Sequence, residues 1–356
     1  MVVVYWCKNF TIALREEDRV NEYKKRQYEW PPLMEEYTPN NTGWRKLYQH
    51  RLHQVEMVEN RSDRYQAYLA ALYSALIGPS STDYGWGITK APKKVVDRLK
   101  KRLADGMASE NKKYERPDVC LEHGDGFEPF HFDDPEMNRE ILNELLPFHE
   151  SWSGVELVPH FAYGLRVYRN ESTFNMHLDK SSTHIISGIL HVDHGEKDEP
   201  WPLVIEDYHG NHNEVFLESG DLLFYESSKL LHGRPRTMNG EYYTSLFLHY
   251  YPKNWEAERL LQDIHYRVPP SWVDAVSRKE LDETSTLSVI DSTFKELECE
   301  DSWCGLVDSK KWYSDGLEYG QYLSGDNKVK LLENIPRETE LSKHSQKKSR
   351  RENSEL

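Results

Sequence analysis

Cysteine and long apolar runs are scarce in this chain of 356 residues, and its 45 Lys and Arg residues are outnumbered by 60 Asp and Glu residues. Its 4 cysteines are scattered, which argues against a disulfide-rich scaffold. Cys299 and Cys304 lie close together, but no second Cys or His pair stands at zinc-site spacing, so we expect free thiols. No run approaches the roughly 18 apolar residues of a spanning helix, so no membrane span is expected. A net charge of −15 argues against a general nucleic-acid binder, which needs a basic surface.

The two ends of the chain and its glycosylation motifs bear on the expected compartment. The apolar opening Met1–Cys7 has no basic leader and meets Lys8 too soon for a signal peptide, so we expect a cytoplasmic protein. A basic segment near the end, Lys343–Arg351, leaves a nuclear address open. A secretory alternative also stays open, because four glycosylation sequons are present, at Asn9, Asn40, Asn60 and Asn170.

The first 154 residues are predicted to be helices and loops that pack on a denser core. Tyr65–Leu76 is a helix candidate, and Pro92–Leu103 is a second, with Gly106 just past its end. A third begins at Asp134-Pro135, where a capping residue precedes a proline. None of these segments carries a motif for chemistry, so we interpret them as packing support.

From about residue 155 to 255, short β-rich runs alternate with turn clusters, which indicates a mainly β core. Eight short strands in about 95 residues are typical of a jelly-roll or double-stranded β-helix. Helix and loop are expected again over 256–335, and a disordered basic tail over 336–356, which makes the whole chain α+β. The expected strands are Phe161–Tyr168, Phe174–Leu178, His184–Val192, Leu203–Glu206, Glu214–Leu217, Asp221–Tyr225, Lys229–Arg234 and Tyr242–Tyr251.

A His-x-Asp motif occurs three times in the chain. Residues i and i+2 of a strand share a face, so one strand can supply two ligands of a two-histidine, one-carboxylate iron site. His131-Phe-Asp133 runs directly into a helix start, and His191-Val-Asp193 runs into a polar turn. His177-Leu-Asp179 lies between two predicted strands, 55 residues before His232. We therefore predict a metal site at His177, Asp179 and His232.

The segment Leu165–Pro252 resembles the catalytic core of the Fe(II)- and 2-oxoglutarate-dependent dioxygenases, nearest their prolyl 4-hydroxylase-like branch. Tyr168 stands nine residues before the first iron histidine and Phe174 three before it, as in that branch. The family's strand ahead of the distal histidine is present as Gly220-Asp-Leu-Leu-Phe-Tyr225. The resemblance covers about a quarter of the chain and implies a double-stranded β-helix that binds Fe(II) through the three predicted ligands.

Two positions depart from the family pattern. The family usually has glycine six residues before the first iron histidine, where this chain has Glu171. It also places a Lys or Arg nine to eleven residues after the distal histidine, to bind the far carboxylate of 2-oxoglutarate; positions 241–243 hold no cation. A carboxylate in a dry pocket needs a partner, and Arg is the side chain that suits it best. Strand alternation favours Arg234, then Arg166, with hydroxyl contacts from Tyr168 and Tyr242.

The resemblance implies hydroxylation of an unactivated C–H with O2 and 2-oxoglutarate, release of succinate and CO2, and ascorbate as a reductant that keeps the iron ferrous. The substrate is left open between a peptidyl group, proline among the candidates, and a small molecule. Two other classes also stay open. One is a cupin-like metalloenzyme that does not use 2-oxoglutarate, which the missing late cation favours. The other is a non-catalytic barrel that serves as an interaction module.

Overall fold

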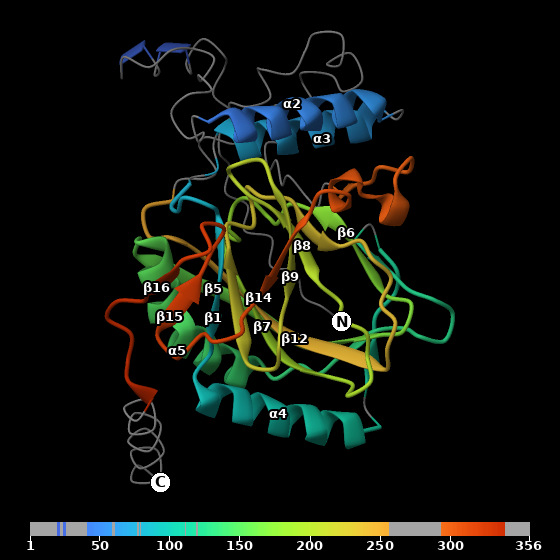
Figure 1. Ribbon diagram of the computed structural model, residues 1–356, viewed down its shortest axis with the longest axis vertical. Helices are drawn as coiled ribbons and strands as arrows, with labels where there is room; N and C mark the ends of the chain where they lie inside the picture. The colour runs from blue at the N-terminus through green and yellow to red at the C-terminus, as the bar shows by residue number, and fades with distance from the viewer. Residues whose placement is uncertain are drawn as a thin grey trace.

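The computed structural model describes residues 20–21, 24–25, 41–58, 61–76, 78, 80–110, 112–118, 120–255 and 293–338. In these ranges the chain forms two antiparallel-rich β-sheets flanked by four helices (Figure 1). None of the described helices combines the length and apolar character that a membrane span requires. The predicted disordered tail falls almost wholly outside the described residues.

The larger sheet has nine strands, and all of their pairings are antiparallel. Its strands are β1 (Trp86–Lys90), β2 (Lys113–Tyr114), β4 (Phe130–His131), β5 (Leu157–Arg169), β7 (Ile186–His194), β10 (Asp221–Tyr225), β12 (Tyr242–Pro252), β15 (Gln321–Leu323) and β16 (Val329–Leu331). They lie in the order β16-β15-β1-β10-β7-β12-β5-β4-β2. The centre of this sheet is therefore built from segments far apart in sequence.

The smaller sheet has seven strands and carries the predicted metal ligands. Its strands are β3 (Leu121–Glu122), β6 (Thr173–His177), β8 (Leu203–Glu206), β9 (His212–Phe216), β11 (His232–Arg234), β13 (Thr293–Phe294) and β14 (Lys310–Tyr313). The order is β13-β6-β11-β8-β9-β14, with β3 also pairing β6, and only β14–β9 is parallel. All eight strands predicted over 155–255 are present, with ends that shift by a few residues.

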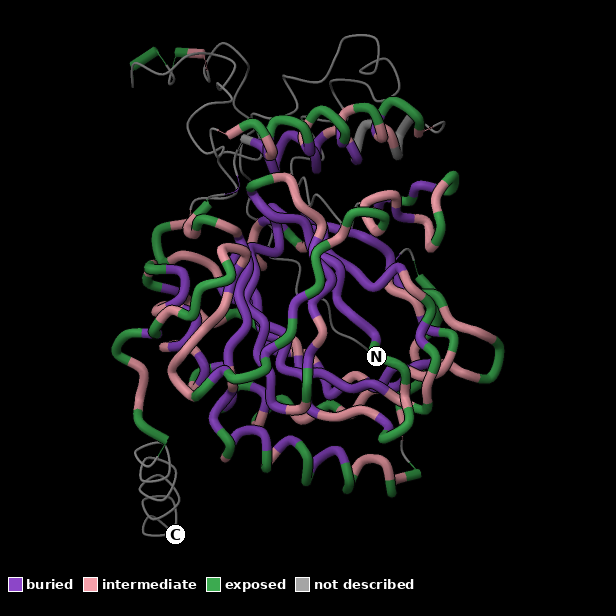
Figure 2. Tube along the Cα trace, in the orientation of Figure 1, coloured by how far each residue is buried: buried purple, intermediate pink, exposed green. Residues whose placement is uncertain are grey.

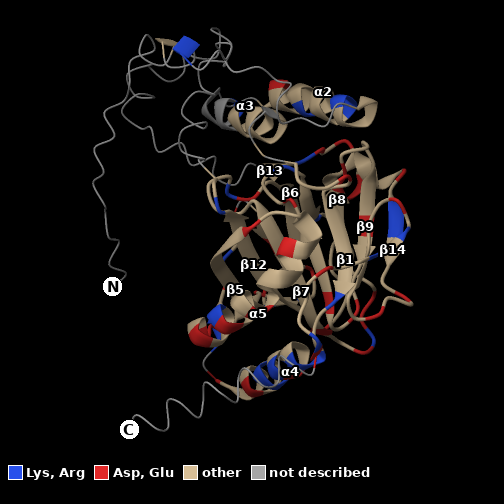
Figure 3. Cartoon of the chain, turned by 90° about the vertical axis from the view of Figure 1, so that its left-hand side faces the viewer, with Lys and Arg blue, Asp and Glu red and all other residues tan. Residues whose placement is uncertain are grey.

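Apolar side chains from both sheets pack against one another, and most residues of the central strands are buried (Figure 2). Ile189 and Leu223 of the larger sheet pack with Ile205 and Val215 of the smaller one. Burial of such a side chain stabilises the fold by about 1.5–3 kcal/mol. The central strands carry few charged side chains, whereas Lys and Arg gather on the helix at residues 93–108 (Figure 3).

The four helices cover the sheets from two sides. α4 (Lys93–Ala108) and α5 (Pro135–Ser153) pack their apolar faces on the larger sheet, and α2 (Thr42–Met57) and α3 (Arg61–Leu76) pack at the smaller sheet. Asp134 caps α5 by accepting a 3.0 Å hydrogen bond from the Met137 amide, as predicted. The prediction for α4 was wrong at its end, because Gly106 lies inside the helix rather than beyond it.

Three other expectations were wrong. The described part of the C-terminal region, 293–338, contains four short strands and two 3₁₀ turns instead of helices. β1 belongs to the larger sheet, so the sheet core is not confined to 155–255. Cys299 and Cys304 form a disulfide, because the turn between them brings their Cα atoms to 5.0 Å.

Candidate metal and co-substrate site

Pairing of β6 with β11 brings the two predicted histidine ligands together. His232 lies opposite His177 in the antiparallel register, so residues 55 apart in sequence share one place on the sheet. Asp179 follows β6, and its amide donates a 3.0 Å hydrogen bond to the Ser227 carbonyl. One ligand atom from each of the three residues lies within 4.8 Å of the others, and no other such set occurs in the described part of the chain.

Hydrogen bonds to the backbone fix both imidazoles in the tautomer that suits a metal. His177 Nδ1 lies 2.9 Å from the Asn175 carbonyl, and His232 Nδ1 lies 2.9 Å from the Leu230 carbonyl. Since a carbonyl only accepts, each Nδ1 carries the proton and each Nε2 offers a lone pair. The two Nε2 atoms lie 3.5 and 3.8 Å from Asp179 Oδ1. Three acceptors that converge without a donor between them fit a cation.

The electrostatics of the three ligands fit the same conclusion. Burial, together with the neighbouring His177, lowers the pKa of His232 to about 4, so the imidazole is neutral at pH 7. Burial opposes ionisation of Asp179, but contacts with His177, His232 and His249 outweigh it and hold its pKa well below the ordinary value. Asp179 Oδ2 is buried and has no hydrogen-bond partner. Two imidazoles and a carboxylate are the donor set of non-haem Fe(II) sites.

The other two His-x-Asp motifs have structural partners. His131 Nδ1 lies 3.4 Å from Glu115 Oε1, and Asp133 pairs with Lys113 at 3.8 Å. His191 Nδ1 donates to the Thr244 carbonyl at 3.0 Å, which orients its ring inside the larger sheet. Neither motif brings a third ligand to its pair.

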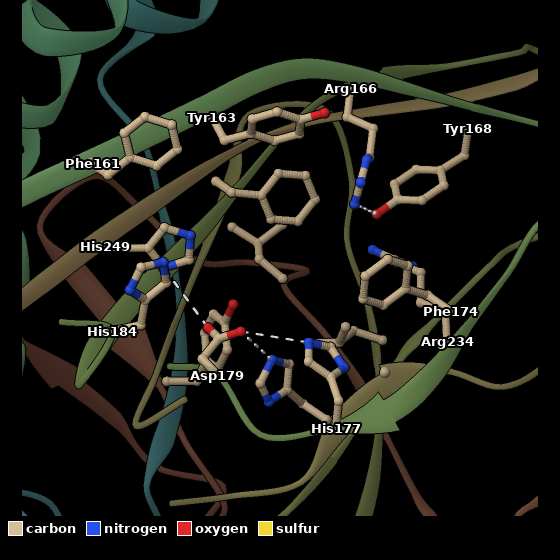
Figure 4. Close-up of a pocket in the computed structure, with 16 residues that line it drawn as sticks. Phe161, Tyr163, Arg166, Tyr168, Phe174, His177, Asp179, His184, Arg234 and His249 are labelled. Carbon is tan, nitrogen blue, oxygen red and sulfur yellow. Dashed lines mark hydrogen bonds and ion pairs between the residues drawn. The ribbon is translucent and has the colours of Figure 1, made fainter. Parts of the chain in front are cut away.

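A pocket of about 380 Å³ opens over the three ligands, between the two sheets (Figure 4). A β-bulge shapes its wall: between the pairs Ser245–Arg166 and Phe247–Tyr163, β5 has one residue more than β12. A bulge of this kind reverses which residues of a strand face inward. Its lining comprises Phe161, Tyr163, Arg166, Tyr168, Phe174, His177, Asp179, His184, Ile189, Leu203, Tyr225, His232, Gly233, Arg234, Phe247 and His249.

Arg234 lines this pocket, and no carboxylate of the described residues forms an ion pair with its guanidinium. Its guanidinium donates to the Trp201 carbonyl and, at 3.0 Å, to the Tyr243 hydroxyl. It also packs on both rings, 4.7 Å from the Trp201 centroid and 4.3 Å from that of Tyr243. These contacts orient the cation without neutralising it.

Arg166 also lines the pocket, but a carboxylate already neutralises it. Glu115 accepts from Nε at 2.9 Å and also from Nη2, which is a bidentate pair. Burial opposes ionisation of Glu115, but the hydrogen bond and charge of Arg166 outweigh it, so the pKa of Glu115 is below its ordinary value. The third nitrogen of Arg166 donates to the Tyr168 hydroxyl at 3.2 Å.

The two tyrosines predicted to contact a co-substrate lie in different places. Tyr168 lines the pocket beside both arginines. Tyr242 does not line it; its hydroxyl donates to Asp193 at 3.0 Å, and the neighbouring Tyr243 contacts Arg234 instead. Strand alternation could not settle which of two consecutive tyrosines faces inward, because β12 has register irregularities on both sides.

Two further features are resolved only by the structure. Glu171, at the position where the resemblance expects glycine, has a φ of 63° in the turn between β5 and β6, the conformation that glycine usually provides. His184 and His249 stand at the far side of the pocket from Arg234 (Figure 4), and His249 was missed because it belongs to no spaced motif.

No family model matches the sequence, and no curated protein matches it. Similar solved structures include a Pseudomonas putida prolyl-4-hydroxylase, 16% identical over 53% of this chain and 100% of that one, with a TM-score of 0.36. HygX from Streptomyces hygroscopicus, with nickel, 2-oxoglutarate and hygromycin B bound, is 12% identical over 49% and 86%, with a TM-score of 0.37.

A third similar structure is a prolyl hydroxylase from Trichoplax adhaerens in complex with a hypoxia inducible factor peptide. It is 10% identical over 60% of this chain and 95% of that one, with a TM-score of 0.38. Two of these three structures are thus prolyl hydroxylases. Their TM-scores lie below 0.5, so the site is interpreted from its own residues.

Proposed function

We propose that this chain is an iron- and 2-oxoglutarate-dependent dioxygenase built on a double-stranded β-helix. The observation that carries the proposal is that one pocket contains both a cluster of metal-binding acceptors, at His177, Asp179 and His232, and a cation without a carboxylate partner, Arg234. A dicarboxylate co-substrate needs both, one end at a metal and the other at a cation. The late cation that the family places after the distal histidine is replaced by Arg234.

The residues would divide the work as follows. His177, Asp179 and His232 would hold Fe(II) on one side and leave its other positions open to the pocket. Arg234 would bind the far carboxylate of 2-oxoglutarate, and Tyr168 would contribute a hydroxyl. Bound iron would supply the coupled oxidation of 2-oxoglutarate to succinate and CO2 and of a substrate C–H to C–OH by O2. The two sheets exclude bulk water and strengthen these charge interactions.

The substrate proposed is a peptidyl group, proline included, or a small molecule that reaches the pocket over Phe161, which is 50% exposed. Ascorbate is proposed as the reductant that restores ferrous iron. For the compartment, the Cys299–Cys304 disulfide favours the secretory alternative over the cytoplasm, since disulfides persist in oxidising surroundings. Enzymatic deglycosylation of protein from its own cells tests that alternative at Asn170, because a glycan there adds mass that the treatment removes.

A direct test of the function is an anaerobic titration. Protein loaded with Fe(II) is mixed with 2-oxoglutarate, and the weak visible metal-to-ligand absorption band is recorded. We expect a band that saturates at one 2-oxoglutarate per iron, and succinate release once O2 is admitted. Iron binding without a band would instead favour the cupin-like class, and the absence of iron binding would favour a non-catalytic barrel.

A further inference from the structure

The half of the pocket away from Arg234 has a polar feature that co-substrate binding does not use. His184 and His249 lie there with ring centroids 3.8 Å apart and ring planes tilted by 31°, near Phe161 and Tyr163 (Figure 4). Phe247 lines the same pocket. A substrate in this half meets aromatic walls and imidazole rings, and the guanidinium of Arg166 is already paired with Glu115.

A chain of hydroxyl groups fixes the tautomer of His249. Ser227 Oγ donates to the His184 carbonyl at 2.8 Å, because a carbonyl only accepts. With that proton used, Ser227 Oγ accepts from Ser187 Oγ, 2.7 Å away. Ser187 Oγ has then used its own proton, so it accepts from His249 Nδ1 at 2.9 Å. His249 therefore carries its proton on Nδ1.

The other neighbour of this nitrogen agrees with that assignment. Asp179 Oδ2 lies 3.8 Å from His249 Nδ1 and is also an acceptor. Nε2, on the other side of the ring, is left with a lone pair and has no partner among the described residues. Because His249 Nε2 is not fully buried, it is accessible from the pocket that His249 lines. The far half of the pocket thus presents a fixed hydrogen-bond acceptor a short distance from the metal ligands.

We propose that His249 is a specificity-determining residue that accepts, through Nε2, a hydrogen bond from an N–H or O–H group of a neutral substrate. The inference rests on the proposed function and adds the substrate class: an uncharged group that bears a donor near the oxidised carbon and packs against aromatic rings. A substrate without the donor leaves Nε2 buried and unpaired when it fills the pocket, which weakens its binding. Ser187 and Ser227 act as positioning residues, because they orient the acceptor without touching the substrate.

Three small probes test the donor requirement. N-methylacetamide offers an amide N–H, 2-propanol offers an O–H, and N,N-dimethylacetamide offers neither. Each is titrated into protein loaded with Zn(II), a redox-inert stand-in for iron, and 2-oxoglutarate, and the ¹³C-labelled methyl of Ile189 in the pocket lining reports binding. We expect at least one donor probe to bind about fivefold more tightly than N,N-dimethylacetamide. The two donor arms distinguish a peptide-type amide from a hydroxyl-bearing molecule.

Variants connect this preference to His249. His249→Phe keeps a ring to stack on His184 but removes the acceptor, so the preference is expected to vanish. Ser187→Ala is expected to reduce it, because Nδ1 loses its nearest acceptor. The matched control is His160→Phe: His160 neighbours His184 with ring centroids 5.8 Å apart, is exposed and does not line the pocket, so the preference should persist.

Two measurements keep the outcome decisive even where a variant fails to fold. Long-range ¹H–¹⁵N spectra of the unsubstituted protein report the tautomer, and an Nε2-protonated His249 overturns the inference. Equal affinity for all three probes does so as well. The 2-oxoglutarate absorption band of the Fe(II) protein separates the two proposals. A band with equal probe affinities contradicts only the donor requirement, whereas the absence of a band contradicts the proposed function and the inference with it.

Discussion

Both histidine ligands are oriented by the backbone carbonyl two residues before them, Asn175 for His177 and Leu230 for His232. This local solution needs no side-chain partner, so the sequence alone could not reveal it. It also makes the imidazoles ready acceptors before any metal arrives, which lowers the cost of assembling the site.

Removal of any one ligand is expected to abolish stoichiometric iron binding. His177→Ala, Asp179→Ala and His232→Ala should each weaken the affinity for Fe(II) by more than about 100-fold, since even indirect partners of a metal contribute 10- to 100-fold. Metal content after desalting measures the loss, and circular dichroism checks that the domain remains folded. Asp133→Ala, in an unused His-x-Asp motif, is the matched control. Full iron occupancy in His177→Ala would show that the site has been misplaced.

The two pocket arginines are expected to differ in what they support. Arg234→Ala should raise the Kd for 2-oxoglutarate about 30-fold, as a charge-assisted hydrogen bond contributes about 2 kcal/mol, and leave the Kd for Fe(II) nearly unchanged. Arg166→Ala should mainly lower the free energy of unfolding, because Glu115 then stays buried without its partner. Titration of the absorption band and urea unfolding separate the effects. An unchanged 2-oxoglutarate affinity in Arg234→Ala would redirect the anchor to Arg166.

Among the elements, β6 and β11 decide whether the site forms, and one glycine sets their spacing. A Cβ on Gly233 would lie 2.7 Å from the carbonyl oxygens of Phe174 and Asn175, closer than real contacts allow. Gly233→Ala should therefore move β11 away from β6, lower the free energy of unfolding by about 1–3 kcal/mol and weaken iron binding. Urea unfolding and metal titration measure both effects. Gly78→Ala is the control, since its Cβ would meet atoms no nearer than 3.4 Å.

Sequence reasoning worked best where elements were long or regularly patterned. The eight strands of 155–255, the helix at 65–76 and the cap at Asp134 all follow from local periodicity and capping chemistry. β1, β13, β14, β15 and β16 escaped it, because each is a short run outside the segment in which β-rich runs and turn clusters alternate. The bulge in β5 and the choice between Tyr242 and Tyr243 depend on register, which only pairing reveals.

In the whole molecule, buried charge joins α2 to the smaller sheet. Arg51 and Glu206 form an ion pair with side chains 5% and 1% exposed. Arg51→Ala leaves a buried carboxylate without its partner and should lower the free energy of unfolding by about 3–5 kcal/mol. Urea unfolding tests this value. The double variant Arg51→Met with Glu206→Leu should recover most of the loss; if it does not, the pair is not the source of the effect.

α2 also contacts the C-terminal segment, through His50 and Glu296, and the stability that this contact contributes should depend on pH. A hydrogen bond with Glu296 raises the pKa of His50, so its contribution is full below pH 6.5, the ordinary value, and is lost as pH rises. Burial opposes ionisation of Glu296, but His50 and the Cys304 amide outweigh it, so its lowered pKa makes its contribution fade as pH falls below 4.5.

The stability difference between the unsubstituted protein and His50→Ala should therefore be largest between about pH 4.5 and 6.5 and shrink above neutral pH. Urea unfolding at several pH values measures it. His53→Ala is the control, because His53 lies on the same helix and is 68% exposed. A difference that does not vary with pH would show that the two side chains do not interact as an ion pair.

The placement of β1 and β14 has a consequence for anyone who trims this chain. β1 pairs with β10 and β14 pairs with β9, although both come from outside residues 155–255. A fragment cut to that range would keep the three ligands and the pocket arginines but bare the hydrogen-bonding groups along β10 and β9. Unpaired strand edges of this kind pair with strands of other molecules, so the excised core should self-associate and precipitate. A well-behaved fragment therefore needs at least residues 42 to 331, because α2 also supplies Arg51, the partner of the buried Glu206.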